Sequence, residues 1–160
     1  MIALHLAACL LALLAIFLVF PARHSSSRPI WLFCLGAAVW SGASAVVAAL
    51  PGTAWSMSAN ALMSPAAAVS ASAALVAARR LVEGNWVVPS WLLLVMALEP
   101  VAILGVRLLL LPDLTSAQFR ETWWFYLHAA YCFALLLSVS FTVNARQRDP
   151  SRRGETFFGG

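Results

Sequence analysis

Charged side chains are scarce in this chain, and lysine is missing altogether. Of the 160 residues only 10% are charged, and all ten basic residues are arginine. Hydrophobic residues make up 62% of the chain, and the mean hydropathy is +0.88. Such a composition leaves too few polar residues to cover a water-soluble globule, so we expect lipid to be the main solvent. Because the arginines stand at the ends of apolar runs and not in an aromatic-lined basic groove, we expect no nucleic-acid binding.

Motifs for catalysis or cofactor binding are also missing. The sequence has no glycine-rich phosphate loop, nucleophile signature, paired-carboxylate motif or zinc-ligand spacing. The three cysteines, Cys9, Cys34 and Cys132, fall inside apolar runs without a CxxC pair, so we expect small hydrophobic core residues. We therefore expect neither an enzyme nor a bound metal or cofactor.

The chain does contain five successive apolar stretches of about twenty residues, the length that crosses a bilayer as a helix. Lipid favours helices there, because an unpaired backbone polar group would cost several kcal/mol. We predict an all-α, polytopic membrane protein with a five-helix transmembrane domain over 1–145 and a basic cytoplasmic tail over 146–160. The predicted spans are 2–20, 30–50, 59–78, 91–111 and 123–143.

Arginines mark alternate connections between these stretches. The first and third connections and the tail carry pairs or clusters, the second carries none, and the fourth carries Arg120 alone. Since cytoplasmic loops are enriched in basic residues, the pattern predicts an outside N-terminus, a cytoplasmic C-terminus and an odd number of spans. The residues that set this topology are Arg23, Arg28, Arg79, Arg80, Arg146 and Arg148.

Small residues indicate where helices approach one another. The third stretch carries Ser64, Ala68 and Ser72 among many other alanines and serines, which keeps nearly every face narrow. Small residues let transmembrane backbones come close, so we expect this helix at the centre of the bundle. Gly36 and Gly42 are expected to do the same on the second stretch.

Glu99 is the most suggestive residue for function. It lies near the middle of the fourth stretch, immediately before Pro100. An ionised carboxylate at that depth is costly, so Glu99 should be protonated, paired or facing water. One interpretation is a proton-responsive or ligand-binding group at a turn loosened by proline. The other, which we favour, is a neutral glutamic acid that bonds neighbouring helices together.

Three further polar residues lie in the predicted outer half. Arg107 lies too far along the same helix to bond Glu99, and we expect it to extend to the outer headgroups instead. His128 should reach a similar depth on the fifth span, near Tyr131. The candidate polar pocket therefore consists of Glu99, Arg107, His128 and Tyr131.

Several short segments in matching order resemble the N-terminal seven-helix sensor module of bacterial membrane histidine kinases and diguanylate cyclases. The resemblance begins at Ile30 and covers close to the whole chain. The amino-acid composition, rich in alanine and without lysine, is similar to that of proteins from a high-GC bacterium. The matching segments are Trp31-Leu32-Phe33 to Ala38-Val39-Trp40-Ser41, Ala97-Leu98-Glu99-Pro100, and Trp124-Phe125-Tyr126-Leu127-His128 with Tyr131.

The resemblance implies a signal-input role in the bacterial plasma membrane, with lipid as the surrounding medium. The sequence departs from the family in lacking the last two helices and any output domain, so we expect a fragment or a stand-alone form that borrows its output. Partners implied are a second copy of the chain or a membrane or cytoplasmic signalling protein. Two alternatives stay open: a structural or assembly subunit of a membrane complex, and, more weakly, a proton-coupled transporter.

Overall fold

The computed structural model describes residues 2–19, 27–83, 86–110 and 116–148, and these residues are almost entirely helical, with no strand among them. The elements are, in chain order, α1 (Ile2–Val19), α2 (Ser27–Ala49), α3 (Ala54–Glu83), α4 (Ser90–Gly105), the π-helical turn η1 (Val106–Leu110), α5 (Ser116–Arg120) and α6 (Trp123–Arg148). The all-α prediction is therefore confirmed for this part of the chain.

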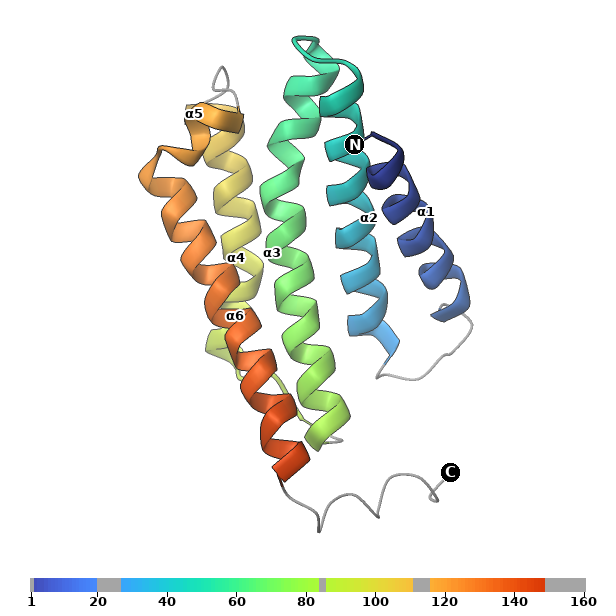
Figure 1. The fold of residues 1–160 in the computed structure, drawn as a ribbon. Helices are drawn as coiled ribbons and strands as arrows, with labels where there is room; N and C mark the ends of the chain where they lie inside the picture. The colour runs from blue at the N-terminus through green and yellow to red at the C-terminus, as the bar shows by residue number, and fades with distance from the viewer. Residues whose placement is uncertain (1, 20–26, 84–85, 111–115, 149–160) are drawn as a thin grey trace.

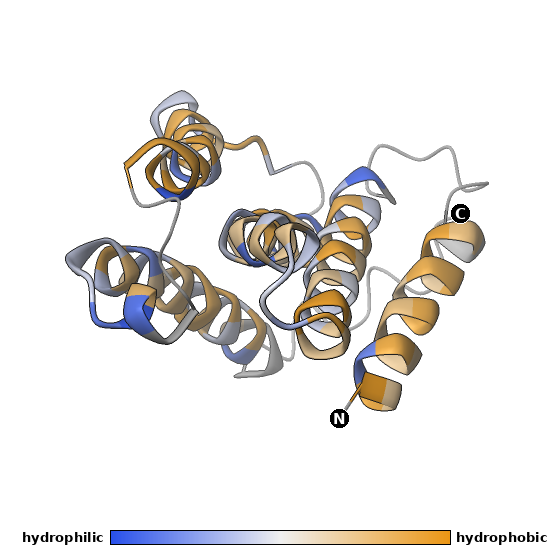
Figure 2. Cartoon of the chain, turned by 90° about the horizontal axis from the view of Figure 1, so that it is seen from above, coloured by the Kyte–Doolittle hydropathy of each residue, from blue (hydrophilic) through white to orange (hydrophobic). Residues whose placement is uncertain are grey.

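Within the part of the chain that the structure describes, four helical segments are long and apolar enough to cross a membrane. They are Arg28–Ala49, Ala54–Val82, Ser90–Leu110 and Trp123–Ala145, whereas the apolar segment Ile2–Phe17 of α1 is shorter. Large hydrophobic side chains project outward from all of them, including Leu10 at 66% exposure, Val101 at 67% and Phe141 at 71%. A water-soluble monomer rarely exposes so much apolar surface, so the exterior is suited to lipid. Figure 2 shows that hydrophobic residues predominate on the helices.

The helix α3 lies at the centre of the bundle, as the small residues predict. It packs against α2 on one side and against α4 and α6 on the other, while α1 is peripheral and packs mainly on α2 (Figure 1). Ala68 is completely buried, and Ser72 is also buried. The side of α3 facing α4 and α6 contributes Ala71 and Leu75 to a core cluster with Met96 and Leu135.

A glycine allows a close approach between α2 and α3. A Cβ atom added to Gly36 would lie 2.9 Å from the carbonyl oxygen of Ala66 and closer still to Ser70 Oγ. Ser70 Oγ donates hydrogen bonds to the oxygen of Ala66 at 3.0 Å and to that of Phe33, across the interface, at 3.5 Å. Gly42 is less crowded, because its added Cβ would meet Cys9 Sγ of α1 at an ordinary contact distance of 3.5 Å.

The turn between α2 and α3 explains why α3 begins at Ala54, earlier than the predicted residue 59. Gly52 adopts a φ of +76°, which favours glycine, and Thr53 Oγ1 then accepts a hydrogen bond of 3.2 Å from the backbone N–H of Ser56. This is a helix N-cap, so the less apolar residues after Thr53 join the helix. At the other end of the chain, α6 continues through Arg148, past the predicted boundary at residue 145.

Candidate functional site

The sequence-predicted residues Glu99 and His128 are brought into direct contact. Glu99 comes from the middle of α4 and His128 from the second turn of α6. His128 Nδ1 lies 2.6 Å from Glu99 Oε1, and the two side chains are only 7% and 17% exposed. The pair joins two helices that otherwise touch at few positions, since both pack mainly on α3.

The local structure of α4 favours this placement of Glu99. Pro100 lies inside the helix, and a proline at that position cannot donate a hydrogen bond to the preceding turn. Beyond Gly105 the helix widens into the π-helical turn η1, a feature that is frequent at functional sites. Glu99 is thus carried by a helix with two interruptions of its regular hydrogen bonding.

The carboxylate and the imidazole form a polar pair with spare hydrogen-bonding capacity. Glu99 Oε2 is buried and has no hydrogen-bond partner among the described residues. His128 Nε2 lies 3.8 Å from Cys132 Sγ, one turn along α6. Chemically, the pair can exist as carboxylate with imidazolium or as neutral acid with neutral imidazole, and either form bridges α4 and α6.

Arg107 does not extend to the headgroups, so that expectation is wrong. Its side chain is only 4% exposed, and its guanidinium carbon lies 4.4 Å from the centroid of the Phe119 ring. The short helix α5, which the sequence did not predict, places the buried Phe119 against Arg107 and supplies this cation–π contact. Burial against an aromatic ring therefore replaces the expected contact with the membrane surface.

Tyr131 lies one turn beyond His128 but bonds to a different helix. Its hydroxyl lies 2.6 Å from Ser72 Oγ on α3. Ser72, predicted only as a small packing residue, therefore contributes a polar contact between α3 and α6. The four residues of the candidate pocket are thus divided among three separate contacts: Glu99 with His128, Tyr131 with Ser72, and Arg107 with Phe119.

A cavity of about 250 Å³ lies beside His128, between α2, α3, α5 and α6. Its polar lining includes Ser64 and Asn60 from α3 and Arg120 from α5, and its apolar lining includes Trp40 from α2. Neither Asn60 nor Trp40 was predicted as a site residue, because only the three-dimensional arrangement places them in the same cavity wall as His128. A space of this size suits a small polar molecule or a few waters.

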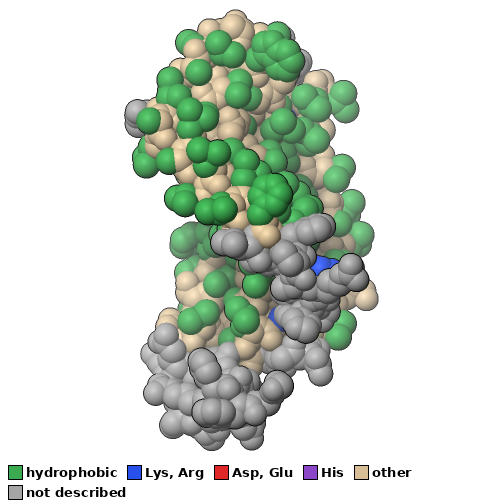
Figure 3. All heavy atoms as spheres, turned by 90° about the vertical axis from the view of Figure 1, so that its right-hand side faces the viewer, with side chains coloured by type: hydrophobic (Ala, Val, Ile, Leu, Met, Phe, Trp, Pro, Cys, Tyr) green, Lys and Arg blue, Asp and Glu red, His purple; other side chains and the backbone are tan. Residues whose placement is uncertain are grey.

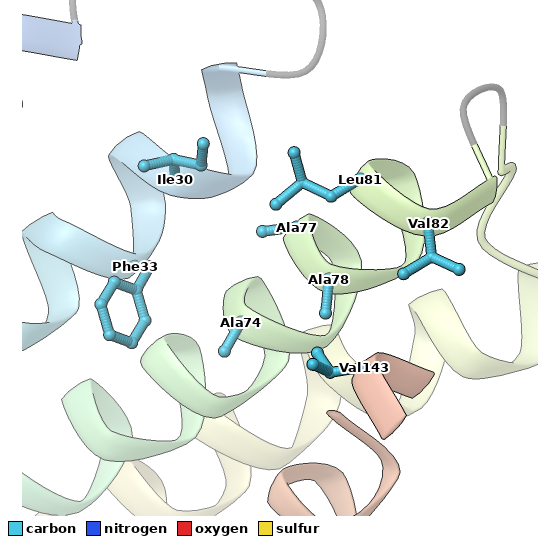
Figure 4. Close-up of a pocket in the computed structure, with 8 residues that line it drawn as sticks. All are labelled: Ile30, Phe33, Ala74, Ala77, Ala78, Leu81, Val82 and Val143. Carbon is cyan, nitrogen blue, oxygen red and sulfur yellow. The ribbon is translucent and has the colours of Figure 1, made fainter. Parts of the chain in front are cut away.

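A second cavity, of about 520 Å³, lies at the other end of the bundle and has an almost wholly apolar wall (Figure 4). Across the cavity, α2 faces α3, and Val143 of α6 closes one side. The other lining residues are Ile30 and Phe33 of α2 and Ala74, Ala77, Ala78, Leu81 and Val82 of α3. Such a wall offers no group for chemistry.

The arginines predicted to set topology gather at this same end. Arg28 lies in the first turn of α2, and Arg79 and Arg80 lie in the last turns of α3. Figure 1 shows these turns together with the last turn of α6, which carries Arg146 and Arg148. Arg23 and the side chains of Arg146 and Arg148 lie outside the described residues. On the face drawn in Figure 3, hydrophobic side chains cover the upper part, and basic side chains are visible only in the lower half.

No group of three or more potential metal ligands occurs among the described residues. Comparison with known proteins returned no matching family model, no matching curated protein and no matching solved structure. The resemblance to bacterial sensor modules therefore stays a prediction from short sequence segments.

Proposed function

We propose that the chain is a non-enzymatic signal-input module of a bacterial membrane, in which the Glu99–His128 pair couples α4 to α6. The observation that carries this proposal is the 2.6 Å contact between the two buried side chains. An intramembrane carboxylate is costly and persists where it has a partner and a role. Because α4 and α6 share few other contacts, a change at this pair would alter their spacing more than a change elsewhere.

The proposed arrangement has five crossings, with the N-terminus outside and the C-terminus cytoplasmic. Four helices have the required length, and α1, whose 18 residues span about 27 Å, supplies the fifth crossing. The gathering of Arg28, Arg79 and Arg80 at one end supports a cytoplasmic assignment of that end. His128, in the second turn of α6, then lies in the outer half with the 250 Å³ cavity beside it. A signal that enters this cavity would reach the pair directly.

A movement of α6 relative to α4 is the output that this proposal requires. We expect Glu99→Gln, which removes the ionisable carboxyl group but keeps the side-chain shape, to shift the spacing between α4 and α6 by about 1–2 Å or more, at the end of the bundle where α4 begins and α6 ends. The measurement is the distance between spin labels at Trp91→Cys and Asn144→Cys, both exposed, in a background with the native cysteines replaced by alanine.

The matched control is Glu121→Gln, the same chemical change at an exposed position near the start of α6. If the distance between the labels is the same in Glu99→Gln as in Glu121→Gln, the Glu99–His128 pair only contributes to helix packing. The signal-input role would then be contradicted. Purification of the chain in a fixed ratio with a larger complex would favour the assembly-subunit alternative instead.

A further inference from the structure

A third cavity, of about 440 Å³, has a lining that changes from charged to apolar along its length. It lies between α2, α3 and α4. Arg28, from the first turn of α2, and Arg80, near the end of α3, contribute to its wall at one end. Ser72 contributes to the other end, eight residues before Arg80 on α3, which is about 12 Å along the helix axis.

Between these ends the wall is apolar and reaches the outside of the bundle. Val69, Val76 and Met96 form its inner side. Leu32 and Leu93 also line it and are 43% and 57% exposed, so the cavity borders the surface that we assign to lipid. The lining therefore offers cationic donors at the end of the bundle and an apolar track leading toward its middle.

We propose that this cavity binds one anionic phospholipid, with the phosphate between Arg28 and Arg80 and an acyl chain along the α3–α4 wall. The planar guanidinium group binds phosphate through paired hydrogen bonds, and basic pockets between transmembrane helices hold acidic headgroups. The apolar track accounts for the acyl chain, which a free phosphate lacks. This inference rests on the membrane insertion proposed above but not on any role of Glu99 or His128.

The first test compares two neighbouring arginines. Arg80 lines the cavity, whereas the guanidinium carbon of Arg79 lies 5.9 Å from the Trp86 ring centroid and Arg79 does not line it. Both variants, Arg80→Gln and Arg79→Gln, lose one charge at the same depth, so they affect membrane orientation alike. We expect Arg80→Gln to bind phosphatidylglycerol about fivefold more weakly, which corresponds to about 1 kcal/mol, and Arg79→Gln to change affinity less than twofold.

The second test blocks the acyl-chain track without changing charge. Ala97 of α4 is exposed and lines the cavity, whereas Ala102 of the same helix is exposed and does not line it. Ala97→Phe is expected to reduce phosphatidylglycerol binding at least fivefold, while Ala102→Phe leaves it unchanged.

Binding is measured by native mass spectrometry of delipidated protein titrated with phosphatidylglycerol or with phosphatidylcholine of the same chains. The wild-type protein should retain phosphatidylglycerol preferentially. Equal retention of the two lipids would contradict an anionic headgroup site. An equal loss of affinity for phosphatidylglycerol in Arg80→Gln and Arg79→Gln would contradict it as well. If glycerol phosphate displaces phosphatidylglycerol at an equal concentration, the acyl chain contributes no affinity, and its proposed position along the α3–α4 wall would be contradicted. Since neither Glu99 nor His128 lines this cavity, failure of the signalling proposal would leave this result unaffected.

Discussion

Replacing His128 by alanine should lower the free energy of unfolding by about 3 kcal/mol, the upper cost of leaving a buried polar group without its hydrogen-bond partner. The loss is large because Glu99 Oε1 would lose its contact with His128, while Glu99 Oε2 already lacks a hydrogen-bond partner among the described residues. The measurement is loss of helical signal during unfolding of the purified protein in detergent.

The double variant Glu99→Met/His128→Leu provides the control. Replacing both members of a buried pair by apolar residues of similar volume is often neutral or stabilising, so we expect stability within about 1 kcal/mol of the wild type. A double variant as unstable as His128→Ala would show that the loss does not come from leaving Glu99 without its partner, and the pair would then lose its assigned role.

Replacing Gly36 by alanine should destabilise the protein by about 1–3 kcal/mol, the usual cost of inserting atoms into a well-packed interface. The added Cβ would lie 2.9 Å from the backbone oxygen of Ala66, which cannot rotate away as a side chain can. α2 and α3 would have to separate at this close approach, and the hydrogen bond from Ser70 to Phe33 would lengthen. Thermal unfolding in detergent measures the effect.

Gly105→Ala is the matched control, because nothing lies within 4 Å of its added Cβ. In a helix, alanine is favoured over glycine by up to about 1 kcal/mol, so this variant should be unchanged or slightly more stable. Equal destabilisation by both substitutions would contradict the close approach of α2 and α3 at Gly36.

The helices themselves were predictable, because hydropathy and length alone define apolar segments of this kind. Their ends were less so. The N-cap at Thr53 lengthened α3 beyond its apolar core, and the N-cap signal is a polar residue that a hydropathy criterion discards. The five-residue helix α5 escaped prediction because its sequence is short and polar and its position depends on contacts with other helices.

The candidate site was predictable in its members but not in its contacts. The cost of charge in lipid identified Glu99, whereas sequence position placed His128 at the depth of Arg107 and not of Glu99. Which side chain faces which depends on the rotation of each helix about its own axis, and no periodic pattern fixed that rotation here. For the same reason the sequence could not show that Arg107 would meet Phe119.

We propose that the chain crosses the bilayer five times, with the Glu99–His128 pair in the outer half. The fifth crossing depends on α1, whose apolar segment Ile2–Phe17 is shorter than the four candidate spans. The most direct measurement places one epitope tag before Met1 and a second after Gly160 and tests access of antibody to intact cells. We predict that the first tag is accessible and the second becomes accessible only after permeabilisation. Tags that behave alike would contradict the odd number of crossings and the outward position of His128.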